Sequence, residues 1–360
     1  MKVLQLGPYP PPHGGVQTNL VAIRRFLRER GVPCAVINLT RHRQANTDDV
    51  YYPQTALEVF KLLRRLPADI IHLHLGGHVT PRLLGLGLAC CSLPGRRAVL
   101  TFHSGGYPLS AAGQSARPYS LRGFVFRRFD KIIAVNEQIV EMFRRFGVPS
   151  QRIQLILPHA LSTPPLETEL PGTIKSFFTS HGPVILSVGL LEPEYDLALQ
   201  IEALGRVRPQ FPNAGLVIIG SGSLEADLRR QIDEKPYGPH VLLCGDVPHD
   251  ATLRAITKSD LFLRTTLHDG DSISVREALH LGVPVIATDN GMRPEGVVLV
   301  PPAQLDALCD VIRNNLVARV EAPSGAAAGE ENLAAVMNLY WEVLENRTFR
   351  GGGGSAGQGL

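Results

Sequence analysis

Short apolar runs alternate with amphipathic stretches along most of the chain, and this alternation limits the possible folds more than any other feature. The run Val3–Gly7 is followed by a glycine-containing loop, then by apolar residues at spacings of four, three and four from Val16 to Leu27, and then by Gly31. That order predicts a strand, a loop and a helix. Strands that are buried on both faces and alternate with helices are typical of a doubly wound parallel sheet. Further strands are predicted at 34–39, 69–75, 98–103, 131–135 and 153–157, with a helix at 137–146.

A proline-rich segment at 162–172 without apolar periodicity divides the chain into two such halves. We therefore predict a linker at 164–182 between an N-terminal domain at 1–163 and a second domain at 183–330. A last helix at 331–347 and a glycine-rich flexible tail at 348–360 follow. In the second domain, strands are predicted at 183–189, 214–222, 241–245, 260–265, 283–288 and 296–300.

The charges are divided unequally between the two halves. Residues 1–160 hold 21 of the 36 basic and 8 of the 33 acidic residues, which leaves 15 basic and 25 acidic residues in the remainder. This asymmetry predicts that the N-terminal half meets an anionic partner, although arginines that merely solvate helix faces would leave the same pattern.

Neither a membrane span nor a disulfide framework is predicted. The longest apolar run, Leu83–Leu93, is far shorter than the roughly 20 residues that cross a bilayer. The N-terminus lacks the features of a secretory signal. The five cysteines are odd in number and contain no CxxC spacing. We therefore expect a cytoplasmic protein.

Ligands of open α/β sheets bind beyond the carboxyl ends of the strands, so the loops there hold the candidate site residues. Gly14 and Gly15 open the helix after the first strand, where backbone N–H groups favour a phosphate, but a plain turn explains the pair equally well. His103 ends a strand at the same edge and is either structural or ligand-binding. His72 and His74 share one face of their strand, but no third ligand stands at a supporting spacing, so we expect no metal site.

Two carboxylates stand eight residues apart in the second domain. Asp269 lies in a short acidic loop, and Glu277 lies on the helix that follows. A ligand at the start of this helix could place an anionic group against backbone N–H groups and hydroxyls against both carboxylates. An acidic N-capping loop with a solvated glutamate would look the same. The candidate ligand contacts here are Asp269, Gly270, Asp271, Ser272, Ile273 and Glu277.

The order of these features resembles the retaining glycosyltransferases of family 4 (glycosyl transferases group 1), which have the GT-B fold and act in cell-surface glycan assembly. The resemblance extends over about residues 1–345. Its most specific part is DGDSISVREALHLGVPVIATDNGMRPEG, which is similar to the family's E-x7-E segment and the strand and turn after it. It also includes PPHGGV, LTFHSGG, DKIIAVNEQIVEMFRRFGVPSQRIQLILPHAL, VILSVGLLEPEYD and LVIIGSGSLEADLR.

The resemblance implies two Rossmann-like domains facing across a cleft, with the acceptor mainly on the first, the nucleotide-sugar donor mainly on the second, and the last helix returning to the first. It assigns the ribose hydroxyls to Glu277 and the transferred sugar to Asp269, which stands where the family usually has glutamate. Gly15 would approach the donor, and His103 would steady the sugar or its developing charge. The implied acceptor is a glycan or a lipid-linked glycan, and no metal or other cofactor is required.

The chain departs from the family where the donor diphosphate binds. After Gly189 the family usually has an arginine and, five residues later, a lysine, but this chain has Leu190 and Tyr195. Losing two cations beside a departing diphosphate should slow the reaction strongly unless other cations replace them. Arg293, in the turn after a strand, is the favoured replacement, and Arg264, at the end of another strand, is the second candidate.

Three other functions stay open. A sugar-nucleotide epimerase would share the fold and the donor. A catalytically weak partner or scaffold subunit would explain the lost cations. A nucleic-acid-binding module is suggested by the basic half alone, and since no reader motif supports it we expect no nucleic-acid partner. Basic and aromatic residues interleave at 122–131, so we also expect contact with anionic lipid at the inner face of the cell membrane.

Overall fold

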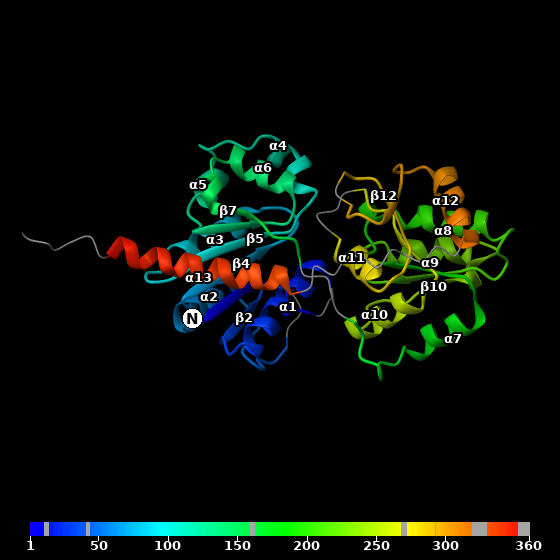
Figure 1. Cartoon of the computed structure of the whole chain (residues 1–360), viewed down its shortest axis with the longest axis horizontal. Coiled ribbons are helices and arrows are strands. Elements are labelled where there is room, and N and C mark those ends of the chain that lie inside the picture. Colours follow the sequence, from blue (N-terminus) through cyan, green and yellow to red (C-terminus); the bar gives the residue numbers. More distant parts are fainter. Residues whose placement is uncertain are drawn as a thin grey trace, which may run out of the picture. The chain divides into compact units, whose positions relative to one another are not determined.

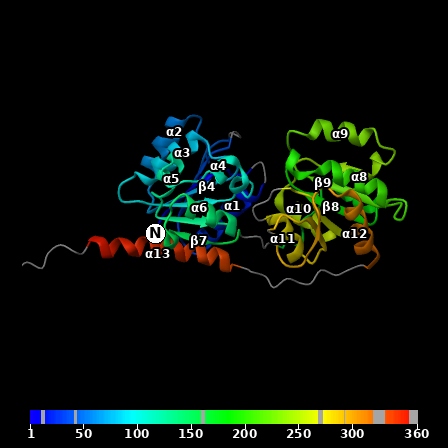
Figure 2. The same cartoon turned by 90° about the horizontal axis from the view of Figure 1, so that it is seen from above.

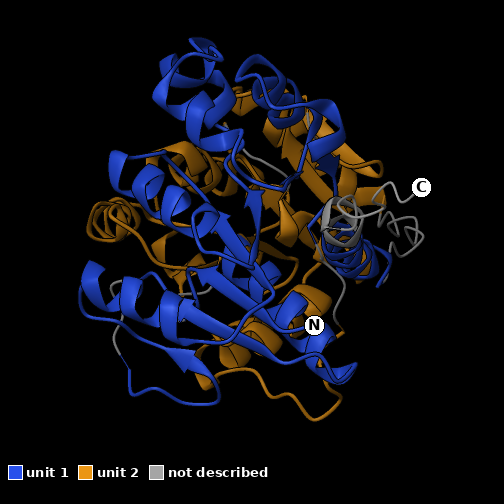
Figure 3. Cartoon of the chain, turned by 90° about the vertical axis from the view of Figure 1, so that its left-hand side faces the viewer, with its two compact units in different colours: residues 1–11, 16–159, 330–360 blue, residues 12–15, 160–329 orange. Residues whose placement is uncertain are grey.

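The computed structural model of the chain describes residues 1–10, 14–40, 44–158, 163–267, 272–291, 293–318 and 330–351. The chain forms two compact units, which Figure 3 shows in different colours. The first comprises residues 1–11, 16–159 and 330–360, and the second comprises residues 12–15 and 160–329. None of the described helices is both long and apolar enough to cross a membrane.

The first unit is built on a parallel sheet in which seven described strands follow the order β3-β2-β1-β4-β5-β6-β7. Figure 1 labels β2, β4, β5 and β7 of this sheet. The predicted strands of this half are all present. The short edge strand β3 was not predicted, because two residues carry no periodicity that a sequence pattern can detect. The strands are β1 Val3–Gly7, β2 Cys34–Asn38, β3 Val50–Tyr51, β4 Ile70–Leu75, β5 Arg97–Phe102, β6 Lys131–Ala134 and β7 Ile153–Leu155.

Helices cover both faces of this sheet, as the burial of its strands on both sides requires. One face packs against α1 (Gly15–Glu29) and α13 (Glu331–Gly351), whose Tyr340 is fully buried among residues from β1, β5 and β6. Figures 1 and 2 show α13 running along the first unit. The other face packs against α2 Ala56–Arg65, α3 Pro81–Cys91, α5 Leu121–Phe126 and α6 Glu137–Arg145, and a short α4 spans Ala111–Gln114.

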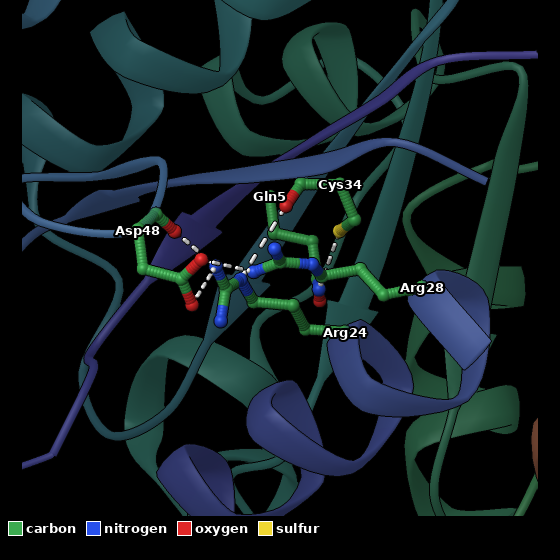
Figure 4. A network of polar contacts seen from close by, with 5 residues as sticks. All are labelled: Gln5, Arg24, Arg28, Cys34 and Asp48. Atoms are coloured by element: carbon green, nitrogen blue, oxygen red, sulfur yellow. Dashed lines mark hydrogen bonds and ion pairs between the residues drawn. The ribbon is translucent and has the colours of Figure 1, made fainter. Parts of the chain in front are cut away.

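A polar network ties α1 to the loop before β3 (Figure 4). Arg24 and Arg28 of α1 both hold the Asp48 carboxylate, at 3.0 and 2.6 Å, and Arg24 also donates to the Asp48 carbonyl. These contacts lower the pKa of Asp48, chiefly through Arg28. Asp48 and Asp49 have φ of 49° and 58°, a region that non-glycine residues seldom adopt, so the two arginines stabilise an unfavourable turn.

The second unit repeats the design with the strand order β10-β9-β8-β11-β12-β13. All six predicted strands are present as parallel strands, which confirms the doubly wound fold class. Its helices are α7 Gly172–Ser180, α8 Leu197–Val207, α9 Glu225–Asp233, α10 His249–Lys258, α11 Ile273–His280 and α12 Leu305–Ala318. Its strands are β8 Val184–Val188, β9 Gly215–Ile219, β10 Val241–Leu243, β11 Leu261–Arg264, β12 Val285–Thr288 and β13 Val297–Val300.

The predicted linker needs one correction. Residues 172–180 form helix α7, in which Ile174 and Phe177 are buried in a core of the second unit. The helix was missed because prolines precede it, and its N-cap residue, Pro171, has no side-chain group to mark the start of a helix.

Candidate functional site

The first sheet reverses its strand order between β1 and β4, and such a switch point is where open α/β sheets bind ligands. Gly7 ends β1, and a Cβ there would lie 2.9 Å from Leu20 Cδ1 and 3.0 Å from His74 Cβ, so a side chain at this position would require these neighbours to move. His103 follows β5, and its backbone N–H donates to the Leu75 carbonyl at the end of β4, 2.8 Å away. The structure therefore places His103 beside the switch point.

His103 belongs to a row of three histidines beneath this edge. The rings of His72 and His74 lie 4.0 Å apart, and those of His74 and His103 lie 5.7 Å apart and are stacked. His72 bonds the hydroxyls of Tyr340 and Thr101, each at 2.6 Å. Both nitrogens of His72 are thus engaged within the protein, which gives this histidine a structural role.

Burial keeps these histidines neutral. Loss of water around the ring lowers the pKa of His72 to about 3 and the pKa of His74 well below its ordinary value. Burial also lowers the pKa of His103 to about 3. His103 is partly exposed, whereas His72 and His74 are fully buried.

The second sheet reverses its order between β8 and β11, and a guanidinium lies at this switch point. Arg264 ends β11 and is buried, its Nη1 donates to the Val188 carbonyl at the end of β8 (2.8 Å), and its Cζ lies 4.6 Å from the centre of the Tyr195 ring. Thr265 Oγ1 donates to the Tyr195 carbonyl at 2.8 Å and so fixes the turn that carries the ring. Tyr195, which stands where the family usually has a lysine, thus packs against a cation from strand β11.

Gly189 is packed too closely to carry any side chain. A Cβ there would lie 2.3 Å from Tyr195 Cε1 and 2.8 Å from Arg264 Nη1. Gly220, which follows β9 and has φ of 136°, lies close to the backbone of Gly189. A Cβ on Gly220 would lie 1.9 Å from the Gly189 carbonyl oxygen. The backbones of the loops after β8 and β9 therefore pack directly against each other beside Arg264.

Helix α11 begins at Ile273, with the buried Ser272 as its N-cap residue, and it carries Glu277. Glu277 is 4% exposed, so it is not the solvated helix glutamate that its position also allowed. Its Oε1 lies 2.7 Å from His249 Nε2 at the start of α10. His249 was not among the predicted residues, because its pairing with a helix 28 positions later leaves no local sequence signal.

Arg293 ties two strand ends together. Its Nε donates to the Thr288 carbonyl at 2.9 Å, and its Nη2 donates to the Thr266 carbonyl at 3.2 Å. The carboxyl edge of the second sheet thus brings together Gly189, Arg264, Ser272, Ile273, Glu277 and Arg293. Gly15, the first residue of α1, and His103 follow strands β1 and β5 of the first sheet. Asp269, Gly270 and Asp271 lie outside the described residues.

Two family models match the chain, one in each half. Residues 13–158 match Glycosyltransferase Family 4, and residues 174–302 match Glycosyl transferases group 1. A 2-deoxystreptamine glucosyltransferase of Streptomyces kanamyceticus is 25% identical over 261 residues, which cover 69% of this chain and 67% of that protein. A phosphatidyl-myo-inositol mannosyltransferase of Mycobacterium tuberculosis is 23% identical over 376 residues, covering 94% and 92%.

Solved structures share the fold at lower sequence identity. Anabaena Alr3699/HepE, in complex with UDP-glucose, superposes with a TM-score of 0.65 at 16% identity and covers 97% of this chain and 99% of its own. A sucrose-phosphate synthase from Thermosynechococcus elongatus superposes with a TM-score of 0.64 at 20% identity, covering 97% and 98%.

Proposed function

Since this chain belongs to the glycosyltransferases of family 4, group 1, and has the GT-B fold, we propose that it moves a sugar from a nucleotide-diphosphate sugar to a glycan or lipid-linked acceptor with retention of anomeric configuration. The observation that carries this proposal is the buried guanidinium of Arg264 at the switch point of the second sheet. A similar solved structure contains UDP or UDP-glucose, and the name of a relative includes GDP-mannose. UDP and GDP sugars are therefore the first donors to test.

In this mechanism Arg264 binds the donor diphosphate and stabilises the charge that gathers on it as the bond to the sugar breaks. A guanidinium fixed in advance by a carbonyl and an aromatic ring costs little reorganisation at that moment. No metal is required in this account. No protein nucleophile is invoked either, because the acceptor attacks from the face that the diphosphate leaves and the departing phosphate takes its proton. Arg293, which sequence reasoning favoured, would support the strand ends instead.

Glu277 would bind the ribose hydroxyls through its carboxylate, with His249 holding one carboxylate oxygen in place. Glu277→Ala should therefore weaken donor binding by roughly tenfold to a hundredfold, since hydrogen bonds to a charged group contribute about 1.5–3 kcal/mol. Isothermal titration calorimetry measures this effect. Glu225→Ala, on the exposed surface of α9, is the matched control. Unchanged affinity in Glu277→Ala would remove this residue from the donor site.

His103 would contact the reacting sugar rather than the nucleotide. His103→Ala should lower turnover by about tenfold, the equivalent of one hydrogen bond of about 1.4 kcal/mol, and should leave the dissociation constant of the nucleoside diphosphate unchanged. Steady-state kinetics together with calorimetry separate the two effects. Turnover equal to that of the wild type would return His103 to a structural role.

A lipid-linked acceptor has to be met at a membrane, and one face of the first unit suits an anionic bilayer. No aspartate or glutamate occurs from Ile70 to Phe129, whereas this segment contains seven arginines. Tyr119 is 98% exposed, and Arg128, just after the neighbouring α5, stacks on the exposed Phe124 of that helix, with Cζ 4.1 Å from the ring centre. Helix α2, which packs on the same face of the sheet, buries only Leu63. The exposed large apolar residues of these segments are Leu57, Phe60, Leu109, Tyr119, Leu121 and Phe124.

The chain should therefore bind vesicles of anionic lipid more tightly than vesicles of neutral lipid, and salt should weaken this binding, because each basic residue near such a surface contributes about 1 kcal/mol. Replacing Tyr119, Leu121 and Phe124 by alanine should reduce sedimentation with anionic vesicles. Val317→Ala, at an exposed apolar position in the second unit, is the control. Equal binding to both kinds of vesicle at low salt would count decisively against membrane contact.

A catalytically weak partner subunit remains the second candidate, because Leu190 and Tyr195 stand where the family has cations. Slow hydrolysis of the donor by the purified chain distinguishes an enzyme from a scaffold. Product analysis without an acceptor distinguishes transfer from epimerisation of the donor sugar.

A further inference from the structure

We propose that Gln5, acting through His74, fixes the tautomer of His103, so that Nδ1 of His103 accepts a hydrogen bond from a substrate hydroxyl. Gln5 and His74 are then positioning residues for the site on the first sheet. The tautomer follows from contacts within this chain alone, and only the identification of the hydroxyl as a substrate group rests on the proposed function.

The amide of Gln5 is held in one orientation. Gln5 lies in β1 and is fully buried, and its Nε2 donates to the Leu20 carbonyl at 3.3 Å and to Cys34 Sγ at 3.2 Å (Figure 4). The reversed amide would turn Oε1 towards the Leu20 carbonyl, which has no proton to donate. Oε1 therefore faces His74 as an acceptor.

This acceptor sets the tautomer of His74. Gln5 Oε1 lies 2.9 Å from His74 Nε2, so Nε2 must carry the proton. Burial lowers the pKa of His74 well below its ordinary value, and the neutral ring has a single N–H. Nδ1 of His74 is therefore unprotonated and can only accept.

The tautomer of His74 in turn sets the tautomer of His103. His74 Nδ1 lies 3.4 Å from His103 Nε2, at the long end of hydrogen-bond distances, and two unprotonated nitrogens would repel each other at that range. His103 therefore donates from Nε2, and its Nδ1 carries a lone pair. Among the residues that the structure describes, no group forms a hydrogen bond with this Nδ1, and His103 is partly exposed at the carboxyl edge of the sheet.

A lone pair at this position selects the kind of group that it binds. A sugar hydroxyl can donate to it, whereas a phosphate or carboxylate oxygen cannot. His103 then acts as a neutral acceptor and not as an imidazolium.

The tautomers can be observed directly with isotope-labelled histidine and long-range proton–nitrogen correlation spectra of the whole chain. In the wild type, His74 and His103 should both show the pattern of the Nε2–H tautomer, with signals assigned by His103→Ala and His74→Asn. In Gln5→Leu, which removes the acceptor, His103 should show a mixture of tautomers. Gln5→Met serves as a second variant if the first does not fold. Tyr340→Phe is the matched control, because it removes a buried hydroxyl from His72 in the same row and leaves Gln5, His74 and His103 untouched.

A double-mutant cycle gives a second readout. Gln5→Leu should lower turnover about threefold to tenfold without changing the affinity for the nucleoside diphosphate, and it should have no further effect in the His103→Ala background. Tyr340→Phe should leave turnover within about twofold. An Nδ1–H pattern for His103 in the wild type, or an unchanged pattern in both Gln5 variants, would overturn the proposal. If the tautomers are as expected and no transferase activity is found, the proposed function fails and the tautomer assignment stands.

Discussion

Replacing Arg264 by alanine should weaken the binding of a nucleoside diphosphate by roughly a hundredfold or more. A guanidinium can form two charge-assisted hydrogen bonds to a diphosphate, and each contributes about 1.5–3 kcal/mol. The burial of Arg264 and its contact with Tyr195 hold it in place before the ligand arrives, so little entropy is lost on binding. Isothermal titration calorimetry of the purified chain with UDP and GDP measures the effect.

Two further variants make this result specific. Arg293→Ala should weaken binding much less, because Arg293 donates to the Thr288 and Thr266 carbonyls and so holds two strand ends together. Arg264→Lys keeps the positive charge but loses the planar guanidinium, so its affinity for the nucleoside diphosphate should lie between those of Arg264→Ala and the wild type. If Arg293→Ala weakens binding more than Arg264→Ala, the phosphate contact belongs to Arg293. If neither variant weakens binding, the start of α11 has to bind the diphosphate without either arginine.

Acid should destabilise the first unit steeply below about pH 6.5. His72 and His74 stay neutral in the folded chain because burial lowers their pKa, to about 3 for His72, whereas the unfolded chain takes up protons near the ordinary histidine pKa of about 6.5. Between these values the unfolded state binds more protons, so the free energy of unfolding falls as the pH falls. Each histidine contributes about 1.4 kcal/mol per pH unit through this window.

The fluorescence of Trp341 reports on this unfolding, because the chain has a single tryptophan and it lies on α13, which packs on the first unit. Urea titrations from pH 7 to about pH 4.5 would give the slope. His72→Gln should reduce the slope by one histidine's share, whatever it does to stability at pH 7. A slope that is the same in His72→Gln and in the wild type would show that folding does not lower the pKa of His72.

The sequence predicted the strands of both sheets because each is a short apolar run, a property that local composition reveals. Most of these runs are buried on both faces, whereas the edge strands β7 and β13 are partly exposed. It also predicted the position of His103 at the carboxyl edge, because His103 directly follows a recognisable strand. The helix that carries Glu277 was predicted because a recognisable strand comes soon after it. The edge strand β3 and helix α7 were missed, one because it is too short and the other because prolines precede it.

Contacts between residues on elements far apart in the chain could not be predicted from the sequence. Arg264 stands 69 positions after Tyr195, and one residue of strand register decides whether its side chain meets that ring or points away. The partnership of His249 with Glu277 and the row from Gln5 to His103 likewise depend on strand order and on rotamers, which only the folded chain specifies.

The most direct measurement is the thermal unfolding of the whole chain with a panel of UDP and GDP sugars, compared between the wild type and Arg264→Ala. A donor at about 100 times its dissociation constant stabilises the state that binds it by about 2.7 kcal/mol. We expect at least one nucleotide sugar to raise the unfolding temperature of the wild type and the same sugar to have little effect on Arg264→Ala. If no nucleotide sugar stabilises the wild type, or if the stabilisation is equal in Arg264→Ala, then Arg264 at the switch point of the second sheet does not form a donor site.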